Sequence, residues 1–139
     1  MREVKQVDIS YSNDEYESGS VFVGVCKSEE LLEQYMEKDY DLLDDDCIGF
    51  ELGVDFGINT YDEDFMVRVF HNQPSNCIDD IFKDAEVFDL SVLKEQYPDG
   101  LEQPYNAVIV ICGMKYEGTI KEVNNKEFGY FKFLGYFEN

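Results

Sequence analysis

The sequence predicts one α+β (mixed α/β) domain, in which a central mixed sheet of about four or five strands is flanked by about three helices. Two uniformly apolar runs, at 20–26 and 105–112, have the composition of strands buried on both faces. Segments between them show the apolar spacing of helices. With 139 residues, 44% of them hydrophobic, the chain can bury roughly two-thirds of its unfolded surface, so we expect a packed core rather than disorder. Within the single domain at 1–139, residues 1–19 are expected to form a peripheral extension.

The first two elements are a strand and a helix. Residues 20–26 (SVFVGVC) are rich in β-branched and aromatic side chains without polar alternation, which predicts a central strand. Residues 28–37 predict a helix, because Ser28 is a good N-cap and two glutamates follow in the first turn, where the helix dipole favours negative charge. The apolar stripe of this helix consists of Leu31, Leu32, Tyr35 and Met36.

The middle of the chain predicts a long connection, a strand and two short helices. Residues 39–64 are acidic and glycine-containing, which indicates a partly helical connection anchored by a few apolar side chains. Residues 65–71 (FMVRVFH) alternate apolar residues with a charged one, the pattern of a less buried strand. Helices are predicted over 76–84 and 89–97, and a Pro-Asp-Gly sequence ends the second of them.

The last third of the chain is dominated by strands. Residues 105–112 (YNAVIVIC) are as apolar as 20–26, so we expect these two strands to be neighbours in the sheet interior. A turn is predicted over 113–118 and a short strand over 119–123. The alternating aromatic residues of 128–138 predict the final strand. The predicted order is therefore β-α-β-α-α-β-β.

The charge of the chain is its clearest functional signal. The sequence contains 31 acidic and 11 basic residues, and its net charge is −20, whereas a magnitude of about 2 to 8 suffices for the solubility of a small domain. Such a chain is repelled by nucleic-acid backbones and by anionic membranes, so direct binding to either is not expected.

No basic residue lies between Lys38 and Arg68, and the carboxylates of that stretch favour a cationic partner. A solvated acidic face is the simpler alternative. The ten carboxylates are Asp39, Asp41, Asp44, Asp45, Asp46, Glu51, Asp55, Asp62, Glu63 and Asp64.

The N-terminus and the cysteines indicate a cytoplasmic protein. The first residues lack the apolar run of a signal peptide, and no stretch approaches the roughly 18 apolar residues of a membrane span. The four cysteines form no C-x-x-C pair, so we expect structural thiols rather than a disulfide framework or a zinc site. They are Cys26, Cys47, Cys77 and Cys112.

No constellation for catalysis is visible, so we expect neither an enzyme nor a metal or cofactor site. The only histidine, His71, lies six residues before Cys77, and a nucleophilic pair of these two is a minor alternative. Asp62 and Asp64 have a spacing that suits a hard cation, but such spacings arise by chance in so acidic a chain. The Asp55-Phe56-Gly57 triplet of kinases occurs without the glycine-rich loop or the H-R-D segment, so we interpret it as a coincidence.

Four stretches stand out by their order and spacing: 20–40 (SVFVGVCKSEELLEQYMEKDY), 55–65 (DFGINTYDEDF), 104–118 (PYNAVIVICGMKYEG) and 131–138 (FKFLGYFE). Together they resemble the Immunity protein 22 family, formerly a domain of unknown function, which is encoded beside toxins in bacterial polymorphic toxin systems. The 55–65 stretch is the most specific part of the resemblance. The family favours a Trp where this chain has Phe22, and a Phe still fills a core position there.

The resemblance implies a non-enzymatic, cytoplasmic antitoxin that binds a cognate toxin domain and blocks it in the cell that makes it. The acidity, the lack of catalytic motifs and the lack of an export signal agree with this function. Many such toxins are nucleases, whose clefts must be basic to hold phosphates. The alternatives are a DNA mimic or general acidic interaction module, and a small metal-dependent hydrolase that uses Asp62 and Asp64.

Eight residues are the candidates for contacts with the partner. Three adjacent aspartates at 44–46 contribute nothing to folding, and a second acidic triplet at 62–64 precedes the predicted strand. Two tyrosines are candidate aromatic anchors. Tyr61, Asp62 and Asp64 have an equal structural alternative, in which they cap the turn into the strand. The eight residues are Tyr40, Asp44, Asp45, Asp46, Tyr61, Asp62, Glu63 and Asp64.

Overall fold

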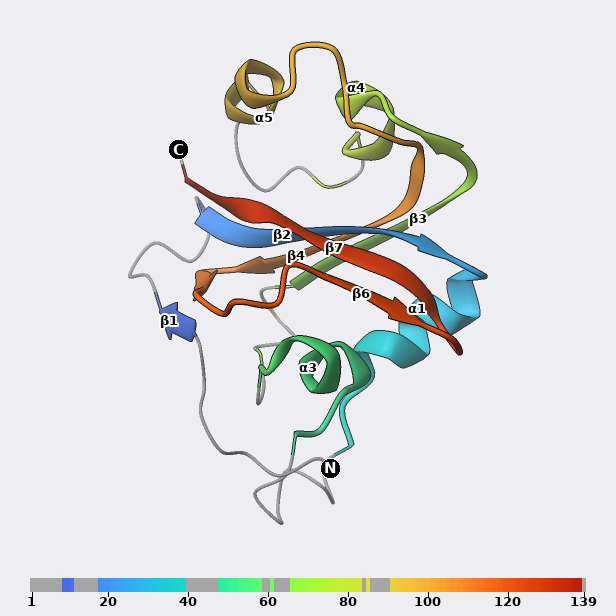
Figure 1. The fold of residues 1–139 in the computed structure, drawn as a ribbon, viewed down its shortest axis with the longest axis vertical. Coiled ribbons are helices and arrows are strands. Elements are labelled where there is room, and N and C mark those ends of the chain that lie inside the picture. The colour runs from blue at the N-terminus through green and yellow to red at the C-terminus, as the bar shows by residue number, and fades with distance from the viewer. Residues whose placement is uncertain are drawn as a thin grey trace.

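A five-stranded antiparallel sheet, with the strand order β3-β4-β2-β7-β6, forms the centre of the protein (Figure 1). The structure, a computed structural model, describes residues 9–11, 18–39, 48–58, 61, 66–83, 85 and 91–138. The predicted α+β class is confirmed. Every pairing in this sheet is antiparallel where a mixed sheet was expected, because apolar composition marks a buried strand without giving its direction. The strands are β2 (Ser18–Cys26), β3 (Met66–Ser75), β4 (Tyr105–Cys112), β6 (Glu122–Asn125) and β7 (Gly129–Glu138).

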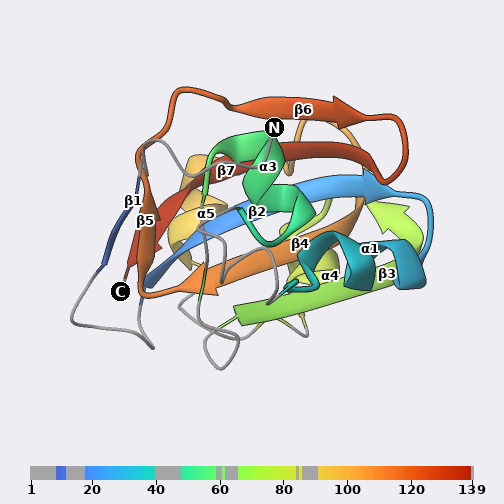
Figure 2. The same cartoon turned by 90° about the horizontal axis from the view of Figure 1, so that it is seen from below.

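Four helices are described, two on each face of the sheet, so the protein has three layers (Figures 1 and 2). On one face lie α1 (Glu29–Met36) and α3 (Glu51–Phe56). On the other lie α4 (Ile78–Ile81) and α5 (Ser91–Gln96). Because both faces are covered, the central strands are apolar on both sides.

The pairing of β2 with β4 confirms the predicted sheet centre. Phe22 is paired with Ile109, and both side chains belong to the core under α1 and α3. The next residue along each strand faces the opposite core, where Val23 is paired with Val108. All four side chains are fully buried. The absence of polar alternation in 20–26 and 105–112 therefore reflects burial on two faces.

Helix α1 begins where the sequence predicted. The Ser28 hydroxyl accepts a hydrogen bond from the backbone N–H of Leu31 at 3.1 Å, so Ser28 is the N-cap. Leu32, Tyr35 and Met36 are buried. The helix ends at Met36, because Glu37 has extended backbone angles.

The segment predicted as a turn at 113–118 contains a short strand, β5 (Met114–Tyr116), which pairs with β1 (Ile9–Tyr11). A buried hydroxyl also holds β5 against β2. The Ser20 hydroxyl donates to the Met114 carbonyl oxygen at 2.7 Å and accepts from the Tyr116 N–H at 2.8 Å. These partners lie more than ninety residues away in the sequence, so no local pattern could indicate this strand.

Three other boundaries differ from the sequence predictions. The short strand expected over 119–123 is β6, which begins at Glu122. The helix expected over 76–84 is the single turn of α4. β3 extends to Ser75 through an irregularity in its pairing with β4 after Phe70. Within the described residues, no helix is long and apolar enough to span a membrane.

The described cysteines are all free thiols. Cys26 is buried at the end of β2 and Cys112 is half-buried at the end of β4, and burial raises the pKa of both thiols. Cys77 is exposed. Cys47 lies outside the described residues.

Candidate partner-binding groove

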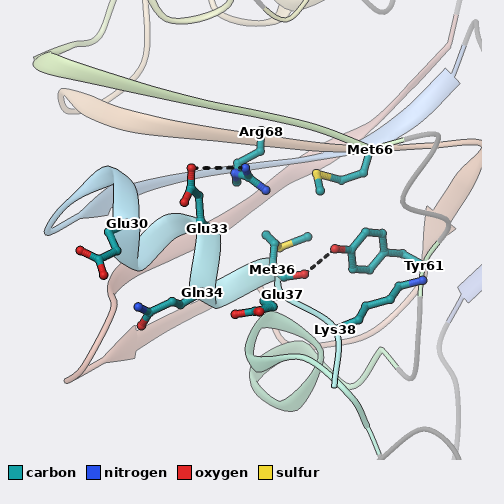
Figure 3. Close-up of a pocket in the computed structure, with 9 residues that line it drawn as sticks. All are labelled: Glu30, Glu33, Gln34, Met36, Glu37, Lys38, Tyr61, Met66 and Arg68. Carbon is teal, nitrogen blue, oxygen red and sulfur yellow. Dashed lines mark hydrogen bonds and ion pairs between the residues drawn. The ribbon is translucent and has the colours of Figure 1, made fainter. Parts of the chain in front are cut away.

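A groove with a volume of about 980 Å³ lies between α1 and the beginning of β3 (Figure 3). The α1 side chains form one wall, and Met66 and Arg68 of β3 face them across the opening. The groove is lined by Glu30, Glu33, Gln34, Met36, Glu37, Lys38, Tyr61, Met66 and Arg68.

Three exposed glutamates give the α1 wall its charge. Glu33 approaches Arg68, with 3.8 Å between Oε1 and Nη2, and both side chains remain substantially exposed. An ion pair with this distance between its atoms and this much exposure to solvent contributes little to stability. No ion pair within the described part of the chain involves Glu30 or Glu37.

The spacing of these acids opposes helix formation. Among the groove glutamates, Glu33 lies three residues after Glu30 and four residues before Glu37, spacings that place like charges side by side on a helix. Glu37 also lies at the C-terminal end of α1, where the helix dipole disfavours negative charge and the last turn contains no basic residue. Glu30 lies in the first turn, where the helix dipole favours its charge, but Glu33 and Glu37 bring α1 no such benefit. These three groove glutamates, Glu30, Glu33 and Glu37, are called the acidic ridge below.

Tyr61 forms an inner wall of the groove and is only 4% exposed. Its hydroxyl donates a hydrogen bond to the Met36 carbonyl oxygen, and its ring packs edge-on against Phe50, with centroids 4.8 Å apart. The Lys38 ammonium lies 4.7 Å from the centroid of the same ring. These contacts pack Tyr61 against the end of α1 and Phe50, whereas the structural alternative placed its side chain at the turn into the strand, and its contact with a partner stays a prediction.

The other seven predicted contact residues lie outside the described residues: Tyr40, Asp44, Asp45, Asp46, Asp62, Glu63 and Asp64. In the sequence, however, they lie within eight residues of a residue of the groove. Lys38 precedes the first acidic stretch, and Tyr61 and Met66 bracket the second.

The Asp-Phe-Gly triplet has a structural role in this protein. One oxygen of the Asp55 carboxylate accepts hydrogen bonds from the Tyr35 hydroxyl at 2.7 Å and from the Asn125 amide at 3.0 Å. This joins α3 to α1 and to β6. Phe56 is buried, and Gly57 ends α3 in the left-handed conformation, with φ of +82°. Sequence analysis missed Tyr35 and Asn125 as partners because they lie 20 and 70 residues from Asp55.

The raised pKa of the Tyr35 phenol makes the free energy of unfolding depend on pH in the alkaline range. Burial, and then the bond to Asp55, raise the pKa of the Tyr35 phenol well above its ordinary value. The folded protein therefore keeps this proton above about pH 10, where the unfolded chain loses it, and the free energy of unfolding falls as pH rises. We expect Tyr35→Phe to lower stability at pH 7 by about 1 kcal/mol and to make the decline above pH 10 shallower.

Urea denaturation at neutral and alkaline pH would measure both effects. Tyr130→Phe is a graded control: the Tyr130 hydroxyl bonds to Glu122 at an exposed site, and burial and that bond raise its pKa to about 12, so its removal should flatten the alkaline decline less than Tyr35→Phe does. An alkaline decline as steep in Tyr35→Phe as in the wild type would contradict the assignment.

The structure gives no support to the nucleophilic pair of His71 and Cys77, and a metal site at Asp62 and Asp64 lies outside the described residues. His71 Nε2 lies 2.9 Å from the Ile81 carbonyl oxygen, so this ring atom is bonded to backbone. The described residues contain no group of three or more His, Cys, Asp or Glu side chains that could hold a metal ion.

Fold and site together define a small α+β domain with an open, polar groove on its surface. A groove of this kind suits contact with another macromolecule better than enclosure of a small ligand. A family model described as Immunity protein 22 matches residues 20–138, and the chain belongs to this family. The match confirms the resemblance and supports an immunity-protein role. Searches of curated proteins and of solved structures gave no match.

Proposed function

We propose that this chain neutralises a cognate toxin domain by placing an acidic surface against a basic cleft of that domain, in the cytoplasm of the cell that makes the toxin. Membership of the immunity family supports the inhibitory role. The acidic ridge of α1 is the observation that carries the mechanism, because its three exposed glutamates gather negative charge on one wall of the groove and the only ion pair described for them is the long contact of Glu33 with Arg68.

The proposed surface combines the groove with the two acidic stretches that lie near its residues in the sequence. The stretches contribute six carboxylates at 44–46 and 62–64, and Tyr40 is the candidate aromatic anchor. With Glu30, Glu33 and Glu37, this forms a surface of one dominant sign on a chain whose net charge is −20. Such a surface attracts a cationic partner over distances of about a Debye length.

A nuclease is the toxin class that this surface fits best. Nuclease clefts carry Lys and Arg to hold phosphates, so an acidic protein can compete for the same side chains. Close pairs of opposite charge at such an interface can couple by about 1.5 to 7 kcal/mol. The toxin is expected to be one of a polymorphic toxin system, encoded beside the gene for this chain.

Salt should slow association with the toxin. The experiment uses a catalytically inactive form of the toxin domain encoded beside this gene and measures association by stopped flow. We expect the association rate constant to fall about tenfold or more between roughly 25 and 500 mM salt, with a smaller change in dissociation, because salt screens long-range attraction. An association rate that does not respond to salt would exclude electrostatic steering. Failure of the two proteins to co-purify, or of this chain to protect toxin-expressing cells, would exclude the function.

A further inference from the structure

The open edge of β3 is the feature that the proposed function leaves unused. β3 is the last strand of the sheet, paired with β4 on one side, and no described strand lies on its other side. None of its residues is buried, whereas seven of the eight residues of β4 are. In an antiparallel strand, alternate residues direct their N–H and C=O groups away from the paired neighbour. Among the described residues, no strand therefore pairs with the outward backbone donors and acceptors of β3.

The two halves of β3 differ in how well they are protected against pairing. The second half contains the irregularity after Phe70 and also Pro74, and a bulge and a proline both discourage a further strand. The first half, Met66–Phe70, is regularly paired with β4 and has Arg68 as its only charge. The opposite sheet edge, β6, has only four residues. Met66–Phe70 is thus the better template for pairing.

This half-strand also borders the groove. Met66 and Arg68 line it, and the approach of Arg68 to Glu33 shows that a cationic side chain on this face of the sheet can reach the α1 ridge. A strand added beside Met66–Phe70 would place every second side chain on the same face. Basic residues at those positions would lie near the glutamates of α1.

We infer that a strand of the cognate toxin, with basic side chains at alternate positions, pairs with the Met66–Phe70 edge of β3 and extends the sheet. The inference rests on the proposed function and specifies how the partner docks. Backbone hydrogen bonds hold the added strand, and the α1 glutamates select its basic side chains. A second copy of this chain is disfavoured as the occupant, because two surfaces of a protein with a net charge of −20 repel each other.

Amide hydrogen exchange tests this inference. The full chain, labelled with ¹⁵N, is measured by NMR alone and with the inactive toxin domain encoded beside its gene. Alternate amides within Met66–Phe70 should exchange at least about tenfold more slowly in the complex, because they become hydrogen-bonded. The amides of β6, at Glu122–Asn125, are the internal control and should not change.

The outcomes separate this inference from the proposed function. A complex that forms while the Met66–Phe70 amides exchange at their free rates would overturn strand addition and leave the antitoxin function intact. Protection of these amides in the chain alone, rising with its concentration, would assign the edge to a second copy and also overturn the inference. If no complex forms, the proposed function and the inference fail together.

Discussion

Replacing Glu30, Glu33 and Glu37 together with glutamine is expected to slow association with the cognate toxin about tenfold or more, while the melting temperature of the free chain stays within about 3 °C. The three side chains are exposed on one wall of the groove, and the only ion pair described for them is the long contact of Glu33 with Arg68. Removing their charge weakens attraction to a basic partner and also relieves like-charge repulsion along α1.

A matched variant separates the position of the charges from their number. Glu95, Asp99 and Glu117 are exposed and none lines the groove, so changing them to Gln, Asn and Gln removes the same net charge elsewhere. We expect this control to slow association much less. Equal slowing by both variants would assign the effect to net charge alone, and an unchanged rate in the groove variant would remove α1 from the interface.

A further variant tests the acidic stretch after α1. Changing Asp44, Asp45 and Asp46 to Asn should weaken inhibition more than it lowers thermal stability. Full protection of toxin-expressing cells by this variant would exclude these three residues from the interface.

Phe56→Ala is expected to have the largest effect on stability. Phe56 is fully buried, and its ring packs edge-on against Phe22 of β2 and Tyr116 of β5, with centroids 5.0 and 6.0 Å apart. Its truncation removes apolar contacts and leaves a cavity where α3, β2 and β5 meet. A loss of about 3 to 5 kcal/mol in the free energy of unfolding is expected.

Urea denaturation with a two-state fit would measure this loss. Ile120→Ala is the control, because Ile120 is 43% exposed and its truncation should change stability by about 0.5 kcal/mol or less. A loss under about 1 kcal/mol for Phe56→Ala would mean that α3 does not belong to the cooperative core.

The sequence predicted best those helices and strands that a local pattern identifies, such as a helix cap or an uninterrupted apolar run. The strand at 105–112 is β4 to the residue, and the capped helix at 28–37 is α1 within one residue at each end. Ser28 and the apolar stripe behind it carry that information locally. β5 and the antiparallel direction of the sheet escaped prediction, because they depend on partners distant in the sequence.

The candidate site was likewise predictable only where its features are local in the sequence. The acidic stretches were visible as runs of like charge, but the groove was not, because it is formed by α1 and β3 from separate parts of the chain. Tyr61 was a candidate for partner contact or for capping a turn, and only the tertiary structure showed that its side chain is buried against Met36 and Phe50. Asp55 was noted as part of the acidic stretch and of the family resemblance, but its role in joining three elements was not predicted, because its partners are distant in the sequence.

By itself, the sequence determined the α+β class, the two doubly buried strands at the centre, the excess of negative charge and the family to which the chain belongs. Those properties follow from composition and from short-range order along the chain. Only the tertiary structure decided which glutamates face Arg68 across a groove, and which hydroxyls and amides meet at Asp55. Such contacts depend on how distant segments pack together, and packing is a property of the whole fold.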